Sequence, residues 1–369
     1  MEIIEAYLDK RQSQTPDEQT TASSGKTSGV APDKTLGHTS VIDINAEKEY
    51  EEMQLVHTAE HTRAYIKIQD GCNQFCSYCV IPFARGRVRS RKPEQVEEEV
   101  RRLAEAGYHE IVLTGIHLSS YGLDFHGESY NTTGGQGNEQ ELLRLIERIH
   151  AVDGITRIRL GSLEPRVITE AFAGALAALP KVCPHFHLSL QSGCDSVLKR
   201  MNRRYTTEEF ARSVEILRRV YEHPAITTDV ITGFPGETEE EFAQTVSYLE
   251  KIRFFEMHVF PYSRREGTVA ADMPGQLTEK EKKQRSSVLL AMTARHSKEY
   301  REYYIGKEQE VLFEQCHEIE GRQYLTGHTR NYVRVAVPVE GIDPAEMTNQ
   351  ERICCLTGFA DDETLLGTY

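Results

Sequence analysis

The sequence has no run of about 18 apolar residues, the length that a membrane-spanning helix requires. Its first residues, MEIIEAYLDKRQSQ, also lack the apolar segment and the small-residue cleavage site of a secretory signal peptide. We therefore expect a cytoplasmic protein that does not enter a membrane. In that compartment, eight cysteines among 369 residues do not predict a disulfide framework.

An excess of positive charge is missing as well, since the formal net charge is −14. Residues 1–60 and residues 305–369 each carry 5 basic and 12 acidic side chains, which leaves 33 of each sign between them. Within that neutral part the basic residues cluster, so the global charge does not exclude a partner that carries phosphate. The clusters are Arg85, Arg87, Arg89, Arg91 and Lys92, and Lys199, Arg200, Arg203 and Arg204.

Large apolar side chains are almost absent from residues 11–40, which are rich in Ser, Thr, Gly and Pro. Such a segment cannot bury enough surface to offset the entropy of ordering. We predict a disordered, acidic linker over residues 11–60, preceded by one or two helical turns over residues 1–10. A polar, Gly-rich surface loop is predicted for residues 124–138.

From residue 61 onward, strand and helix patterns alternate. The predicted strands are 64–69, 110–115, 155–162, 185–193, 226–237 and 255–263. The predicted helices between them are 93–107, 141–150, 167–179, 206–221 and 238–252. Regular alternation predicts a parallel sheet, and six units indicate a partial (β/α)6 barrel rather than a closed one with eight units. The fold class is therefore α/β, and the site is expected at the carboxyl ends of the strands.

The pattern changes after a long helix over residues 277–304, which begins at a Thr278–Glu281 capping box. Five short strands follow, at 308–314, 322–329, 331–337, 351–359 and 363–367. They predict a second domain over residues 305–369, a small all-β barrel of a class that often binds RNA. Aromatic and cationic side chains suited to base stacking are Tyr324, His328, Arg330 and Tyr332.

Three cysteines with the spacing C-x3-C-x2-C, Cys72, Cys76 and Cys79, follow the first strand. Structural zinc takes four ligands, usually as two separated pairs, and no fourth Cys or His lies at a pairing distance in the sequence. Three thiolates on a [4Fe–4S] cluster leave one iron open to bind a cofactor or substrate. A zinc-binding RNA module remains the alternative.

With an aromatic residue, Tyr78, before the last cysteine, this loop resembles that of the radical S-adenosylmethionine (SAM) superfamily. The resemblance implies that Cys72, Cys76 and Cys79 are the catalytic centre and the ligands of a [4Fe–4S] cluster whose open iron binds SAM. One electron then cleaves SAM, and the resulting 5′-deoxyadenosyl radical abstracts hydrogen from an unactivated carbon. Residues in the positions of the family's cofactor-binding motifs are Tyr78, Thr114, Gly115, Ser189, Gln191, Ile231, Gly233 and Glu237.

Longer strings, among them LGSLEP, HLSLQSGCDSVLKRMNRRYT and TDVITGFPGETEEEF, resemble the radical methylthiotransferases over residues 62–369. These transferases insert a methylthio group into a C–H bond, and the final barrel resembles their TRAM domain, a tRNA-binding module. CSYCVIPFARGRVRSR and LTGIHLSSYG are most similar to the enzymes that act on N6-threonylcarbamoyladenosine, on the 3′ side of the anticodon. The resemblance implies the 2-methylthio product, a tRNA anticodon loop as partner, and an electron donor such as flavodoxin or ferredoxin.

The arginines after the cysteines alternate, so an extended backbone would place them on one face. Such a strap could bind loop phosphates or the threonyl carboxylate, and pairing with acidic helices is the alternative. We assign substrate binding to Arg85, Arg87, Arg89, Arg91 and Tyr332. His185 and His187 are interpreted as core or supporting residues.

No cysteine precedes Cys72, whereas the resemblance implies an additional N-terminal domain with three more cysteines and a second cluster. We therefore expect a truncated chain in which residues 1–10 are a remnant of that domain. It should bind one cluster and cleave SAM but methylthiolate tRNA poorly. The alternatives are a methylthiotransferase for isopentenyladenosine in tRNA or for a ribosomal-protein aspartate, and a non-catalytic, cluster-containing RNA-binding protein.

Overall fold

The computed structural model describes residues 44–45, 47, 49–51, 62–126, 139–341 and 343–369. The predictions for residues 1–10, for most of the linker and for the Gly-rich segment beyond residue 126 lie outside these described residues. Within them, no helix combines the length and the apolar character needed to cross a membrane.

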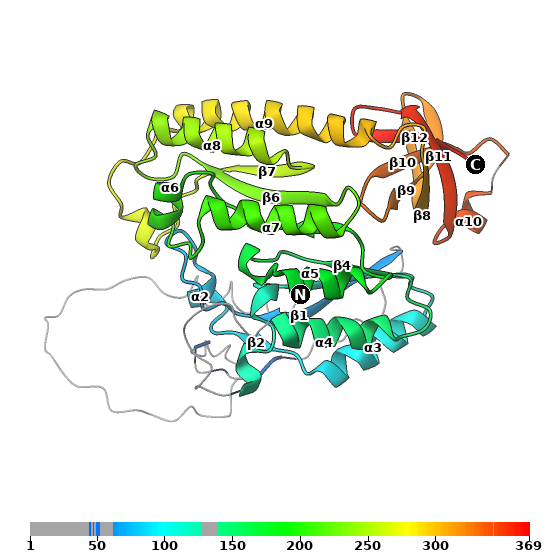
Figure 1. Ribbon diagram of the computed structural model, residues 1–369, viewed down its shortest axis with the longest axis horizontal. Helices are drawn as coiled ribbons and strands as arrows, with labels where there is room; N and C mark the ends of the chain where they lie inside the picture. Colours follow the sequence, from blue (N-terminus) through cyan, green and yellow to red (C-terminus); the bar gives the residue numbers. More distant parts are fainter. Residues whose placement is uncertain (1–43, 46, 48, 52–61, 127–138, 342) are drawn as a thin grey trace, which may run out of the picture. The chain divides into compact units, whose positions relative to one another are not determined.

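Six parallel strands follow one another in chain order, as the alternation of patterns predicts (Figure 1). They are β1 (Arg63–Asp70), β3 (Glu110–Gly115), β4 (Arg157–Leu160), β5 (His185–His187), β6 (Ala225–Thr232) and β7 (Glu256–Pro261). Hydrogen bonds divide them into two sheets after β4, where only isolated parallel bridges such as Leu163–Leu188 continue the series. Pro184, which has no N–H, directly precedes the short β5. The α/β class and the partial barrel are confirmed.

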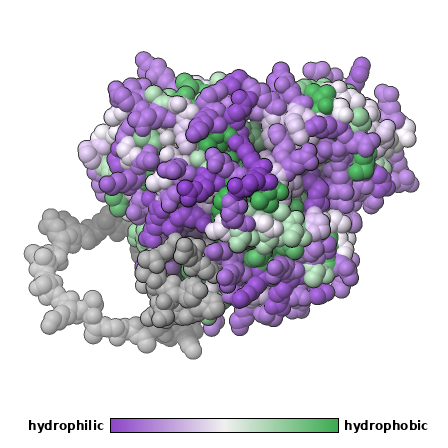
Figure 2. All heavy atoms as spheres, in the orientation of Figure 1, coloured by the Kyte–Doolittle hydropathy of each residue, from purple (hydrophilic) through white to green (hydrophobic). Residues whose placement is uncertain are grey.

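Helices connect these strands in the predicted places, and their apolar stripes face the strands. On α3, Val96 and Val100 lie one turn apart and are fully buried. The helices are α3 (Pro93–Glu105), α4 (Glu139–His150), α5 (Glu170–Ala177), α7 (Thr207–Val220), α8 (Glu239–Ile252) and α9 (Glu279–Glu302). The predicted Thr278–Glu281 capping box begins α9. The molecular face in Figure 2 is mainly hydrophilic, with apolar side chains in small groups.

The last part of the described chain forms a closed five-stranded barrel in the order β10-β12-β11-β8-β9, which confirms the predicted strands. Its elements are β8 (Glu308–Ile319), β9 (Arg322–Thr329), β10 (Arg334–Pro338), α10 (Pro344–Met347), β11 (Glu351–Phe359) and β12 (Thr364–Thr368). Alternating apolar residues such as Val311 and Phe313 fill its interior. Phe255, which precedes β7, packs into the same core.

Buried charges join this barrel to the amino ends of β1, β3 and β4. Glu110 is fully buried, and its Oε1 lies 2.9 Å from Arg159 Nε and 3.3 Å from Arg63 Nε. Arg63 also pairs with Glu314 of β8. Tyr332 accepts a hydrogen bond of 2.7 Å from Arg63 Nη1, and its ring lies under the guanidiniums of Arg63 and Arg159. We call these five residues the joint.

Arg157, at the start of β4, reinforces the joint although it is completely buried. Its Nε lies 2.8 Å from Glu351 and its Nη2 lies 3.1 Å from Glu310, both in the barrel. Its Nη1 also donates to the carbonyl oxygen of His328 at 2.9 Å. The barrel is therefore held at the strand ends opposite those that carry the cysteines.

Candidate functional site

The three clustered cysteines lie in the loop between β1 and α2 (Ile81–Ala84), at the carboxyl ends of the strands. Cys72 is buried, Cys76 and Cys79 are partly exposed, and none of them forms a disulfide. The backbone N–H of Cys72 donates to the carbonyl of Gly86 at 3.1 Å, and that of Cys79 donates to Cys76 at 3.0 Å. In a parallel (β/α) fold, this is the end at which catalytic groups gather.

Gly71 allows the chain to turn directly before Cys72. It has a φ of +70°, and a Cβ at this position would lie 1.8 Å from the carbonyl oxygen of Arg87. The preceding Gln69 fixes the turn, because its Nε2 donates to the carbonyls of Asp70 and Gly71 at 2.6 and 2.7 Å. The cysteine loop thus depends on a close backbone approach that only glycine permits.

We expect Gly71→Ala to lower the free energy of unfolding by about 2–5 kcal/mol, from left-handed strain together with overpacking. Gly107→Ala is the matched control, since Gly107 also has a positive φ but no atom lies within 4 Å of its added Cβ. Urea unfolding measures both, and the iron content after reconstitution should fall for Gly71→Ala only. Equal losses of stability in the two variants would contradict the close approach.

The chemistry of the donor set decides which metal group the loop can hold. Structural zinc takes four ligands in a tetrahedron, usually as two separated pairs. The loop instead offers three cysteines on one short segment, and three thiolates can ligate three irons of a [4Fe–4S] cluster and leave the fourth iron open. The donor set therefore fits a [4Fe–4S] cluster.

Hydrogen-bond donors of the protein reach the sulfurs of Cys72 and Cys76. The backbone N–H of Gln74 lies 3.4 Å from Cys72 Sγ, and Arg203 Nη1 lies 3.2 Å from Cys76 Sγ. Burial raises the pKa of the free Cys72 thiol to about 11. A bound metal must therefore offset this cost of ionisation, and both N–H donors would favour the thiolate form.

Arg203 is held rigidly beside the cysteines. Its guanidinium stacks on Tyr205 at 4.8 Å, and its Nε donates to that hydroxyl group at 3.0 Å. The Tyr205 hydroxyl group in turn lies within 2.7 Å of the carbonyls of Ser189 and Leu190, just beyond β5. From the sequence, Arg203 was identified only as a member of a basic cluster. Its contact with Cys76 was not predicted, because the two residues are distant in the sequence.

A carboxylate that the sequence did not single out lies on the same side of the site. Glu164 accepts a hydrogen bond from Gln74 Nε2 at 3.2 Å and lies 3.3 Å from His117 Nε2. Burial opposes ionisation of Glu164, but His117, Arg166 and Arg203 outweigh it and hold its pKa at about 2. The site therefore contains a charged carboxylate at neutral pH.

The predicted cofactor residues at the end of β3 contact the protein itself. Thr114 Oγ1 donates to the carbonyl of Ile66 at 3.2 Å. A Cβ on Gly115 would lie 3.0 Å from Oε1 of Gln69, which accepts the backbone N–H of His117 at 2.8 Å. Gly115 thus makes room for Gln69, and its role in cofactor binding stays a prediction.

At the ends of β5 and β6, the predicted residues come together. Gln191 has a left-handed φ of 74°, its N–H donates to Asp229, and its carbonyl accepts the N–H of Ile231, both at 2.9 Å. Ile231 and Tyr78 pack against one apolar cluster that contains Phe234. Ser189 lies two residues before Gln191, at the carbonyl that accepts from Tyr205.

Glu237 is a correction to the predicted cofactor contacts. Its carboxylate is 1% exposed, because Arg285 Nη1 at 2.6 Å and the backbone N–H of Gly233 at 2.8 Å enclose it. Burial raises the pKa of Glu237, although Arg285 acts in the opposite direction. The carboxylate therefore fixes the turn at Gly233, which has a φ of 68°, rather than facing a ligand.

The predicted arginine strap is also wrong as a shared face. Arg91 is buried and pairs with Glu99 of α3. Arg89 is the first residue of the short strand β2 (Arg89–Ser90) and is buried as well. Arg85 is exposed, but it donates to Asp70 at 2.6 Å. The alternative of pairing with an acidic helix therefore holds for Arg91, whereas Arg85 and Arg89 face Asp70 at the end of β1. Arg87 remains exposed, with its guanidinium 4.6 Å from the centre of the Phe75 ring.

Tyr332, predicted to contact substrate, belongs to the joint at the opposite strand ends. Its ring stacks between His185 at 5.0 Å and His328 at 4.6 Å. Arg330 likewise donates to the carbonyls of Pro180 and Val182 instead of facing solvent. These aromatic and cationic side chains therefore fasten the barrel, and the prediction that Tyr332 binds substrate is wrong.

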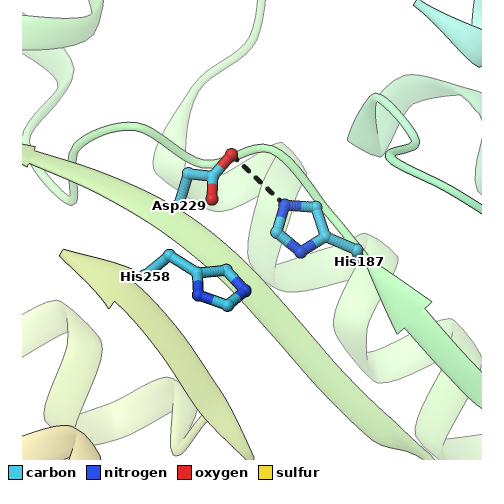
Figure 3. Close-up of side chains that lie close together, drawn as sticks. All are labelled: His187, Asp229 and His258. Atoms are coloured by element: carbon cyan, nitrogen blue, oxygen red, sulfur yellow. Dashed lines mark ion pairs between the residues drawn. The ribbon is translucent and has the colours of Figure 1, made fainter. Parts of the chain in front are cut away.

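A polar trio that the sequence did not reveal extends across the three strands of the second sheet. Figure 3 shows His187 of β5, Asp229 of β6 and His258 of β7 directed toward one another. His187 Nε2 lies 3.3 Å from Asp229 Oδ2, and one ligand atom from each residue lies within 4.8 Å of the others. Thr227 Oγ1 contacts His187 Nδ1 at 3.0 Å and fixes the ring. This trio can accept hydrogen bonds from a polar ligand.

Known proteins are similar to this chain in sequence. A family model described as the Radical SAM superfamily matches residues 66–249. The threonylcarbamoyladenosine tRNA methylthiotransferase MtaB of Bacillus subtilis is 41% identical over 297 residues, which are 80% of this chain and 63% of that protein. The tRNA-2-methylthio-N(6)-dimethylallyladenosine synthase of Pelotomaculum thermopropionicum is 41% identical over 259 residues, 70% of this chain and 55% of that protein. The chain thus spans less than two thirds of the length of these curated relatives.

Two solved structures are similar at lower identity. The radical SAM methyltransferase TsrM of Kitasatospora setae has a TM-score of 0.45 and 23% identity, over 56% of this chain and 38% of its own. Coproporphyrinogen III oxidase (HemN) of Escherichia coli has a TM-score of 0.47 and 16% identity, over 65% of this chain and 54% of its own.

The matched residues 66–249 include the cysteine loop and most of the strands whose ends surround it. The cysteine loop, the family model and the curated relatives agree. The chain therefore belongs to the radical SAM superfamily, whose cofactors are a [4Fe–4S] cluster and SAM, and within it to the methylthiotransferase family.

Proposed function

We propose that this chain forms the radical SAM core of an enzyme that methylthiolates tRNA. Its substrate is N6-threonylcarbamoyladenosine on the 3′ side of the anticodon, and its product is the 2-methylthio derivative. The observation that carries the proposal is the cysteine loop at the carboxyl ends of the strands, in a chain 41% identical to a threonylcarbamoyladenosine tRNA methylthiotransferase. A target in a single-stranded anticodon loop can leave its stack and enter such a site.

Cys72, Cys76 and Cys79 would hold the cluster, and Tyr78, Thr114, Gly115, Ser189, Gln191, Ile231 and Gly233 would surround SAM. When bound, the cluster supplies the electron that cleaves SAM and thereby the radical that acts on a C–H bond. A flavodoxin or ferredoxin would deliver that electron. Arg203 keeps a positive charge 3.2 Å from Cys76 Sγ, and the buried Glu164 keeps a negative charge nearby.

We infer that two parts of the chain have separate roles. Residues 61–304 would carry the chemistry, and the barrel of residues 305–369 would act as a TRAM-type tRNA-binding module. The joint would hold the two in a fixed relation while the anticodon loop is bound.

Nucleoside mass spectrometry of tRNA from a strain without the gene tests the substrate. We expect 2-methylthio-N6-threonylcarbamoyladenosine to disappear while its unmodified precursor accumulates. A relative whose name gives dimethylallyladenosine as its substrate is also 41% identical to this chain. Loss of the methylthio derivative of that nucleoside in the deletion strain would therefore favour the alternative substrate. An unchanged set of methylthio nucleosides would refute tRNA methylthiolation.

A further inference from the structure

Three side chains of the cysteine loop and the segment after it form a group in which Phe83 and Arg87 are exposed and Phe75 is partly buried. Phe75 lies between the ligand positions Cys72 and Cys76, and its ring meets that of Phe83 edge-on at 6.0 Å. The guanidinium of Arg87 lies 4.6 Å from the centre of the Phe75 ring. We call Phe75, Phe83 and Arg87 the aromatic platform.

The backbone holds the platform in place at an energetic cost. Phe75 has a φ of 51°, a left-handed conformation that is rare for a bulky residue and costs about 1–2 kcal/mol. Asn202 Nδ2 donates to the carbonyl oxygen of Phe75 at 2.9 Å and so ties this conformation to the segment after α6 (Asp195–Arg200). Strain that the surroundings maintain is typical of functional positions.

The exposure of Phe83 and Arg87 is not explained by packing. Phe83 is 59% exposed, although α2 could have placed a polar residue there without loss to the core. Among the described residues, no carboxylate pairs with Arg87, in contrast to Arg85 and Arg91. The exposed ring of Phe83 and the guanidinium of Arg87 can therefore bind a partner.

This combination matches the chemistry of single-stranded nucleic acid. Exposed aromatic rings stack on nucleobases of any sequence, and an arginine beside them binds the backbone phosphate. Phe75 directly precedes Cys76, and Phe83 and Arg87 contact Phe75, so a nucleotide bound at the platform would lie near a base inserted into the site. An anionic partner also suits Arg87, because its charge has no intramolecular counterpart among the described residues.

We infer that the aromatic platform is a stacking site for an anticodon-loop nucleotide that flanks the modified base. The inference rests on the proposed function and adds to it the residues that receive the neighbouring nucleotide. The ring of Phe83 would carry the base, Phe75 would support that ring, and Arg87 would contact the phosphate.

The experiment uses the reconstituted 369-residue chain and an anticodon stem-loop RNA that contains N6-threonylcarbamoyladenosine, with 2-aminopurine at the adjacent loop position. Binding should quench the 2-aminopurine fluorescence through stacking. Phe83→Ala should weaken binding about 5- to 150-fold and relieve the quenching, whereas Phe83→Tyr should retain both. Arg87→Gln should reduce the slope of log K against log salt by about 0.7.

Leu290→Ala is the matched control, because Leu290 of α9 is 51% exposed and lies outside the platform. Iron content and 5′-deoxyadenosine release, measured without RNA, should be unchanged in Phe83→Ala and show that the site is intact. RNA affinity within twofold of the parent for both Phe83→Ala and Arg87→Gln would overturn the inference, and is the result expected if the platform docks a protein. A parent chain that binds no RNA would instead refute the proposed tRNA partner.

Discussion

Cys76→Ala is expected to leave the reconstituted protein without its brown colour and without measurable 5′-deoxyadenosine release from SAM in the presence of dithionite. Only Cys72 and Cys79 would remain in the loop, and two thiolates do not retain a cluster that needs three. Arg203 Nη1 would also lose the sulfur acceptor that lies 3.2 Å away. The loss should be complete rather than graded, because the cluster itself is absent. Iron analysis, absorbance near 400 nm and chromatography of the nucleoside product measure it.

Cys316→Ala is the matched control for the loss of one cysteine. Cys316 is a free, exposed cysteine on β8 of the barrel, far along the sequence from the loop. Its variant should retain iron and SAM cleavage at the level of the parent. A colourless parent with one zinc per chain would favour the zinc-module alternative, and brown Cys76→Ala protein that still cleaves SAM would contradict the assignment of the ligands.

A parent that binds the cluster and RNA but releases no 5′-deoxyadenosine would support the non-catalytic alternative. This outcome is distinct from the zinc alternative, because the colour remains. It would also show that the chain has the fold of the superfamily without its activity, since the activity requires SAM to bind at the open iron.

The sequence predicted the strands because their patterns are local. The apolar faces of α3 and α4 repeat with the helical period, and the cysteine spacing is read directly from residues 72–79. The roles of Glu164, Asp229 and His258 were missed, since each meets its partners only when separate strands come together. Periodicity contains no information about such contacts between distant segments.

The arginines after the cysteines show why composition alone misleads. Arg87 and Arg91 have the same chemistry and alternate with small residues, yet one is exposed and the other is buried against Glu99. β2 has only two residues, so the extended face that alternation requires does not form. The prediction for Tyr332 was wrong for the same reason, because an aromatic ring that contacts guanidiniums suits a buried joint as well as a base-stacking surface.

The joint is where we expect the largest loss of stability. Glu110→Gln removes the carboxylate that faces the buried guanidiniums of Arg63 and Arg159 and leaves their charges without this partner. Breaking a buried pair from one side costs about 3–5 kcal/mol. The midpoint of urea unfolding at pH 7 should fall accordingly, and Glu170→Gln, which breaks the exposed pair with Arg219, should cost at most about 1 kcal/mol.

The effect of Glu110 on stability should also depend on pH in a defined direction. Burial opposes ionisation of Glu110, but Arg159 and Arg63 outweigh it and hold its pKa at about 2, below the ordinary 4.5. A lowered pKa stabilises the folded state above pH 4.5, and this stabilisation, about 3 kcal/mol, is lost as the pH falls toward 2. The difference in unfolding free energy between the parent and Glu110→Gln should therefore be smaller at pH 3 than at pH 7. A difference that stays constant or grows on acidification would mean that Glu110 is not held ionised by the joint.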